Sequence, residues 1–202
     1  MNLALTHMPS SAALPCSKSR AITALVTRSS RSVLQNLFNT HCVIPAALGA
    51  EFVGSGGRWP DIARTLARER IIVPDAVDGT CLLWAFGTLI GNTDMHSGNL
   101  SFMPEQGRPY LLAPAYDMTP MAFAPTAGGD LPERRLPLHI GDQMPSGTWR
   151  QARPIAQAFV RRLEETKDLS DGFALCLAAL QAHIQEAAER IGRLDSAPWS
   201  SL

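Results

Sequence analysis

One stretch of this chain is apolar on nearly every side, and it constrains the fold more than any other feature. Pro74 and Asp75 are typical of a helix start, and mostly apolar residues follow as far as Ile90. A helix that is apolar all round is buried at the centre of a domain. Gly91 and Asn92 then favour a helix end. We therefore expect a domain built around this helix, with a polar loop directly after it.

Other patterns predict helices before and after the central one. A proline-started amphipathic period runs from Trp59 to about Arg70, and two further helices are expected at about residues 154–167 and 171–194. Six apolar residues are expected on the core side of the last helix: Leu175, Leu177, Leu180, Ile184, Ala187 and Ile191. The fold class is therefore mainly α.

A small β-hairpin is expected after the central helix. Residues 99–103 and 108–113 read as two short strands joined by a turn that contains proline and glycine. Residues 120–150 are rich in proline and glycine, and we expect a long ordered loop there. The complete fold class is mainly α with a small β-hairpin.

The N-terminal part of the chain differs in composition from the remainder. No Asp or Glu precedes Glu51, and this part is rich in serine, threonine and arginine without a sustained apolar period. We interpret residues 1–45 as an unassigned N-terminal arm and residues 46–202 as one domain. Hydrophobic residues make up 46% of the 202 residues, enough for a globular core.

Charge and cysteine usage limit the classes of partner. The net charge is zero, so there is no electrostatic reason to expect nucleic acid or an anionic membrane. The longest uncharged apolar stretches fall well short of the ~20 residues that a membrane span needs. The cysteines are widely spaced and form no metal-site pattern, which favours reduced thiols in a cytoplasmic protein: Cys16, Cys42, Cys81 and Cys176.

The candidate catalytic residues come directly after the central helix. Asn99 lies five positions after Asp94, and Asp117 comes some twenty residues later. This spacing is typical of kinase-type phosphoryl transfer, in which one carboxylate accepts the hydroxyl proton while an amide oxygen and a second carboxylate hold Mg²⁺. The hairpin would bring Asp117 back beside the loop that carries Asp94. The spacing of Asp94 and Asn99 would occur often by chance, and alone it favours a turn aspartate and a solvated loop aspartate. The helix before it, the hairpin after it and the second aspartate at the strand end favour the catalytic interpretation.

Residues 89–102 and 112–117 strongly resemble the C-terminal lobe of HipA-like serine/threonine kinases, the toxins of bacterial toxin–antitoxin modules. The similarity runs from about Glu51 to the last helix. The resemblance implies a protein-kinase-like lobe in which Asp94 is the catalytic base and Asn99 and Asp117 bind Mg²⁺. It also implies ATP as the phosphoryl donor, a protein hydroxyl as the acceptor and an antitoxin-like partner.

The loop lacks the positively charged side chain that familiar kinases carry at this place. Familiar kinases carry a lysine within this loop to meet the γ-phosphate, whereas here the chain has only Lys18 and Lys167. His96 is the one candidate in the loop for this cofactor contact. The alternative is that His96 hydrogen-bonds to the loop backbone. Asp117 is also followed by Met118 and Thr119 in place of Phe-Gly, so no familiar activation switch is assumed.

The nucleotide-binding lobe of a kinase is not visible in the sequence. The glycine cluster at residues 54–57 precedes a proline-started helix, and no lysine follows it until Lys167, so we interpret it as a connection. We expect weak or no activity from the chain alone, with a separate chain supplying this lobe. A non-catalytic toxin remnant that binds partners, or a metal-dependent hydrolase that uses the same carboxylates, are the alternatives.

Overall fold

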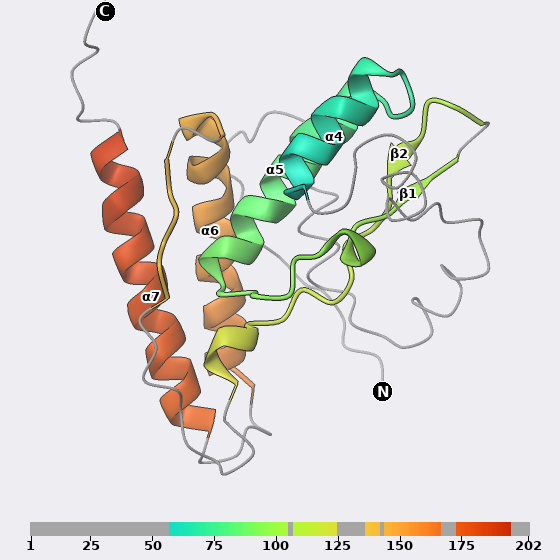
Figure 1. Ribbon diagram of the computed structural model, residues 1–202. Helices are drawn as coiled ribbons and strands as arrows, with labels where there is room; N and C mark the ends of the chain where they lie inside the picture. Colours follow the sequence, from blue (N-terminus) through green and yellow to red (C-terminus); the bar gives the residue numbers. More distant parts are fainter. Residues whose placement is uncertain (1–56, 105–106, 125–135, 142–143, 167–172, 195–202) are drawn as a thin grey trace, which may run out of the picture.

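The computed structural model describes residues 57–104, 107–124, 136–141, 144–166 and 173–194. The expected arm at residues 1–45 and most of the glycine cluster at 54–57 lie outside these ranges. The described part is mainly helical with one small antiparallel hairpin (Figure 1), which confirms the expected fold class at this level. The helices are α4 (Trp59–Arg68), α5 (Pro74–Leu89), α6 (Ser146–Glu164) and α7 (Phe173–Leu194).

Helix α5 is the centre of the domain, as its sequence predicts. It packs against α4 on one side and α6 on the other, and α7 lies along α6 (Figure 1). One core cluster joins α5 to α6 and α7 and includes Phe86, Trp149 and Leu180. A second joins α5 to α4 and the hairpin and includes Leu66 and Phe102. Because α5 is buried on both sides, its position fixes the point at which the next loop begins.

Helices α4 and α5 end in the same way. After α5, Gly91 has φ +70°, the N–H of Asn92 donates to the Gly87 carbonyl at 2.8 Å, and the N–H of Gly91 donates to Thr88 at 3.2 Å. This is a Schellman ending, which turns the chain sharply away from the helix axis. Arg70 takes the equivalent place after α4, with φ 54°. The predicted helix end at Gly91 is therefore confirmed.

The hairpin is shorter than expected. Strands β1 (Phe102–Met103) and β2 (Leu111–Leu112) pair antiparallel, with Phe102 opposite Leu112. The expectation that Asn99 begins the first strand is wrong, because Ser97–Asn99 forms the short 3-10 helix η1. The N–H of Asn99 donates to the His96 carbonyl at 3.1 Å, so its backbone bonds belong to this turn and not to a strand.

Helix α6 starts earlier than the sequence indicates. The sequence predicts a helix start at Pro154 and a loop over residues 120–150, but α6 begins at Ser146 and a short 3-10 helix, η2 (Met121–Phe123), lies within the same range. Pro154 therefore lies inside the helix, which loses one backbone hydrogen bond. Burial of Trp149 and Ala152, both 0% exposed, explains why the first turns are helical despite the proline.

Helix α7 confirms most of the predicted core face. Leu180, Ile184, Ala187 and Ile191 are buried, and Leu177 packs partly against the same cluster. The placement of Leu175 on the core side is wrong, since this side chain is 65% exposed. The buried stripe instead continues back from Leu180 to Cys176, four positions earlier, at the helical period.

The thiols of Cys81 and Cys176 are buried, whereas Cys16 and Cys42 lie outside the described residues.

None of the helices within the described ranges has the length and apolar character that crossing a bilayer requires.

Candidate active site

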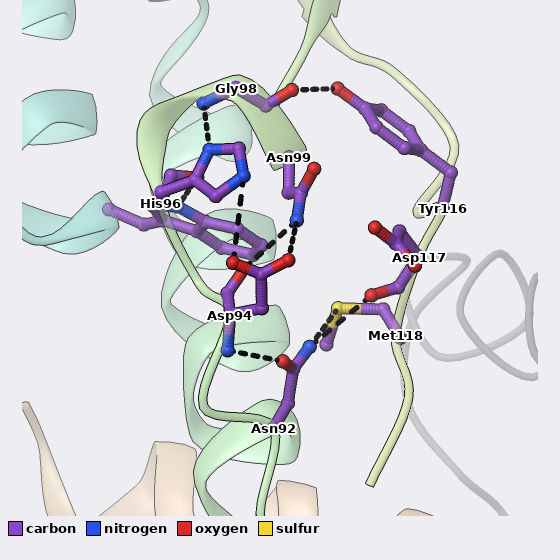
Figure 2. A network of polar contacts seen from close by, with 9 residues as sticks. Asn92, Asp94, His96, Gly98, Asn99, Tyr116, Asp117 and Met118 are labelled. Carbon is purple, nitrogen blue, oxygen red and sulfur yellow. Dashed lines mark hydrogen bonds and ion pairs between the residues drawn. The ribbon is translucent and has the colours of Figure 1, made fainter. Parts of the chain in front are cut away.

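Two segments meet beside the C-terminal end of α5. The loop at residues 92–99 leaves α5 directly, and residues 115–118 return past it after the hairpin (Figure 2). Asp94 and Asn99 belong to the first segment, and Asp117 belongs to the second. Figure 2 shows Asn99 between Asp94 and Asp117, as expected if the three side chains act on one bound group.

Asn99 is oriented by Asp94. Its Nδ2 donates to the Asp94 backbone carbonyl at 2.9 Å and lies 3.5 Å from the Asp94 Oδ2. With the amide nitrogen directed at Asp94, the amide oxygen of Asn99 points away from that residue (Figure 2). A metal ligand must present oxygen, so this orientation suits the predicted role.

Asn92 joins the two segments. Its side chain is only 4% exposed; Oδ1 accepts from the Asp94 backbone N–H at 2.9 Å, and Nδ2 donates to the Asp117 carbonyl at 3.3 Å (Figure 2). One side chain therefore fixes the backbone of both carboxylate-bearing residues. The sequence indicates only a helix-ending role for Asn92. A polar residue directly after a wholly apolar helix is the signal that it would be buried and bonded.

Asp117 has an unusual backbone. Its φ is 54°, in the left-handed region that non-glycine residues rarely adopt, and its side chain is exposed. Aspartate tolerates this conformation better than most residues, and such strain is concentrated at functional sites. The hydrogen bond from Asn92 to the Asp117 carbonyl helps to hold this conformation.

His96 is bonded within its own loop. Its Nδ1 accepts from the Gly98 backbone N–H at 2.9 Å, so the ring proton belongs on Nε2, which lies 3.7 Å from the Asp94 Oδ1 (Figure 2). The contact with the loop backbone, which is the alternative to a cofactor contact, is thus present. The ring is also exposed, with 59% of its side-chain surface accessible, so Nε2 lies beside Asp94 within reach of solvent.

Two aromatic side chains fix the loop from outside, and sequence reasoning missed both roles. Trp59, at the start of α4, donates from Nε1 to the His96 carbonyl at 2.8 Å. Tyr116 donates from Oη to the Gly98 carbonyl at 2.6 Å (Figure 2). The Ser101 hydroxyl lies 2.8 Å from the same Oη. The bonds from Trp59 and Tyr116 both end on loop carbonyls, so the loop is held through its backbone while Asp94 is left exposed.

The oxygen donors fit Mg²⁺ better than a metal that needs a protein cage. Mg²⁺ is usually held by one or two carboxylates together with waters and substrate phosphates. The Asp117 carboxylate is exposed and the Asn99 amide oxygen points away from Asp94, so two oxygen atoms on neighbouring segments suit such an ion. No group of three or more His, Cys, Asp or Glu side chains suited to a metal occurs among the residues that the structure describes.

Comparison with known proteins gives the family. The family model of the HipA-like C-terminal domain, which describes the sequences of that family, matches residues 22–193. Toxin YjjJ of Escherichia coli (strain K12) is 33% identical over 148 residues, which cover 73% of this chain and 33% of that protein. The chain thus spans about a third of the length of this curated relative. No solved structure matches. The chain therefore belongs to the family of the HipA-like C-terminal domain.

Proposed function

We propose that this chain supplies the metal-binding and base half of a HipA-like serine/threonine protein kinase, which transfers the γ-phosphoryl group of Mg·ATP to a protein hydroxyl. The observation that supports this most is the arrangement of Asp94, Asn99 and Asp117 on two segments that the Asn92 side chain joins. A protein-kinase-like lobe needs these three residue types in this chain order.

Each residue has a stated role in this proposal. Asp94, which is exposed, accepts the proton of the attacking hydroxyl. The Asn99 amide oxygen and the Asp117 carboxylate hold Mg²⁺, and the ion neutralises charge on the phosphates. His96 contacts the γ-phosphate through Nε2, the ring nitrogen that the loop backbone leaves available. The hydrogen bond of Asn99 to the Asp94 carbonyl keeps the base and the metal ligands in register.

The partners are proposed on the same basis. The described residues include no lysine and no glycine-rich loop followed by a strand, so the nucleotide-binding lobe is assigned to polypeptide beyond them. Without that lobe, the described part is expected to have little or no activity, because positioning and charge neutralisation perform most of phosphoryl transfer. The similarity to a protein named as a toxin supports an antitoxin-like partner. A protein substrate is part of the proposal because the acceptor of a serine/threonine kinase is a protein hydroxyl.

A phosphoryl-transfer assay, run at the Mg²⁺ concentrations of the cytoplasm, tests the proposal. The chain is incubated with γ-labelled ATP, alone and with the parts of the longer relative that it does not cover. Mg²⁺-dependent labelling of protein is expected in the mixture. Asp94→Asn keeps the shape of the side chain but removes its basicity, and should lower the rate on the order of 10²-fold or more.

The matched control for this assay is Glu189→Gln on α7. This substitution makes the same chemical change at an exposed carboxylate whose ion-pair partner, Arg193, lies 3.9 Å away on the same helix. The control should leave the labelling rate unchanged. Absence of labelling in every mixture, with partner binding retained after Asp94, Asn99 and Asp117 are all changed to alanine, would instead support a non-catalytic interaction module.

A further inference from the structure

A pocket of about 380 Å³ adjoins the loop that carries Asp94, and neither Asp94 nor Asp117 lines it. Thr93 and Met95 line it, whereas the intervening Asp94 does not and turns towards His96. The remaining lining residues come from the position before α4, the C-terminal half of α5, the start of the loop, a separate segment and the middle of α7: Arg58, Trp84, Thr88, Gly91, Asn92, Leu136, Pro137, His139 and His183. This volume is within the range of small-molecule sites, roughly 300–1,000 Å³.

The pocket has an apolar body. Trp84, Met95 and Leu136 line it and are all partly buried, so each keeps some apolar surface accessible to an occupant. Trp84 also packs edge-on against the buried Trp59, with ring centroids 5.9 Å apart, which fixes the orientation of its ring. A rigid aromatic wall of this kind favours a flat or branched apolar group.

The polar groups of the pocket favour a negative charge. Arg58 and His139 line it and are exposed, and no described Asp or Glu does so. Arg58 Nε lies 3.0 Å from Asp61, but Asp61 is shared with Arg64, also at 3.0 Å, so these three side chains together keep a net positive charge. A guanidinium binds carboxylates through two parallel hydrogen bonds.

We propose that this pocket binds a small organic carboxylate, whose apolar part lies against Trp84 and Met95 and whose charge lies at the rim that carries Arg58 and His139. The occupant contacts Asn92, Thr93 and Met95 but none of the residues proposed to bind Mg·ATP or to act as the base, which are Asp94, His96, Asn99 and Asp117. The site is therefore separate from the proposed Mg·ATP site, and the inference does not depend on kinase activity.

Fluorescence titration of the full chain, without Mg²⁺ or ATP, tests this proposal. The probes are phenylacetate, the neutral 2-phenylethanol and the cationic 2-phenylethylamine, which share an aromatic ring and differ in charge. Phenylacetate should change the tryptophan emission at the lowest concentration, and Trp84→Phe should remove most of the change. Equal or weaker binding of phenylacetate than of 2-phenylethanol would overturn the proposal.

Substitutions of Arg58 and His139, the two exposed residues proposed to face the ligand's charge, test where the carboxylate of the ligand binds. Arg58→Ala should weaken phenylacetate binding by about tenfold, as expected for loss of a charge-assisted hydrogen bond. Arg68→Ala, which removes an exposed arginine of α4 that does not line the pocket, should leave it unchanged. His139→Ala on a different segment is a second, independent variant and should also weaken binding. Equal affinity in Arg58→Ala, His139→Ala and Arg68→Ala would contradict the assignment.

Discussion

Helix α5 and the loop at residues 92–99 are adjacent in the chain but are held in opposite ways. The helix is fixed by apolar burial, with Phe86 and Leu89 each 1% exposed. The loop is fixed by hydrogen bonds that Trp59 and Tyr116 donate to its carbonyls and that Asn92 accepts from the Asp94 N–H, while the Asp94 side chain stays exposed. Stability therefore resides mainly in the helix, and the proposed chemistry resides in the loop. Substitutions should affect the two properties separately.

The largest loss of stability is expected in the helix. Phe86→Ala removes a buried ring that lies edge-on to Phe159, with centroids 6.0 Å apart, and should lower the free energy of unfolding by about 3–5 kcal/mol. Urea denaturation measures the change. Leu175→Ala on α7 is the control: this leucine is 65% exposed, and the effect should stay within about 0.5 kcal/mol. Similar losses in both variants would show that burial does not decide the stability of the helices.

The junction between the two regions should give the next largest effect. A Cβ at Gly91, where φ is +70°, would lie 2.5 Å from the Phe123 ring, so Gly91→Ala should destabilise by about 1–3 kcal/mol. Gly147→Ala, in the first turn of α6, meets no atom within 4 Å and should be neutral or slightly stabilising. Thermal unfolding of the two variants distinguishes a requirement for glycine at Gly91 from a general effect of the substitution.

Asn92→Ala should separate stability from chemistry most clearly. It removes the two bonds that join Asp94 to Asp117 and should lower stability by about 1–2 kcal/mol. The affinity for Mn²⁺, used as a probe of the proposed Mg²⁺ site, should fall by about 10-fold or more. The neighbouring Thr93→Ala is the matched control and should change the Mn²⁺ affinity little. An unchanged affinity in Asn92→Ala would mean that the loop does not depend on this residue.

The same contrast explains what the sequence could and could not predict. The apolar run of α5 predicts its own burial, and Gly91 predicts its end, because burial and backbone freedom are local properties of residue types. The start of α6 could not be predicted in this way. Burial of Trp149 outweighs the local signal of Pro154, and that burial depends on α5, a distant part of the chain.

The site shows the same division. The spacing of Asp94, Asn99 and Asp117 could be recognised because the proposed chemistry depends on these residue types in this order. The side chains that hold the loop in place could not be recognised from the sequence. The hydrogen bond from Trp59 to the His96 carbonyl, for example, joins residues 37 positions apart and leaves no pattern in the sequence. The expected strand start at Asn99 is wrong for a related reason. The turn that holds Asn99 depends on the His96 side chain, which accepts from the Gly98 N–H.

The smallest effect is a pH dependence that belongs to the helical region. Burial lowers the pKa of His183, which packs against Phe123, although the Thr88 carbonyl and Glu186 oppose this and Arg190 adds to it. The unfolded chain therefore takes up the proton first as the pH falls. The contribution of His183 to the free energy of unfolding should be fully present above about pH 6.5, the ordinary pKa of histidine. The free energy of unfolding should decline below that pH. Urea midpoints at several pH values measure this, and the decline should be smaller in His183→Gln.

The most direct test of the proposed kinase site is metal binding in the presence of nucleotide. Titration of the chain with Mn²⁺ and a non-hydrolysable ATP analogue should show binding that Asp117→Asn weakens by about 10-fold or more. Glu189→Gln should match the unchanged chain, and both variants should unfold at the same urea concentration as it does. Equal Mn²⁺ affinity in the unchanged chain and Asp117→Asn would contradict the claim that Asp94, Asn99 and Asp117 form the metal and base half of a kinase site.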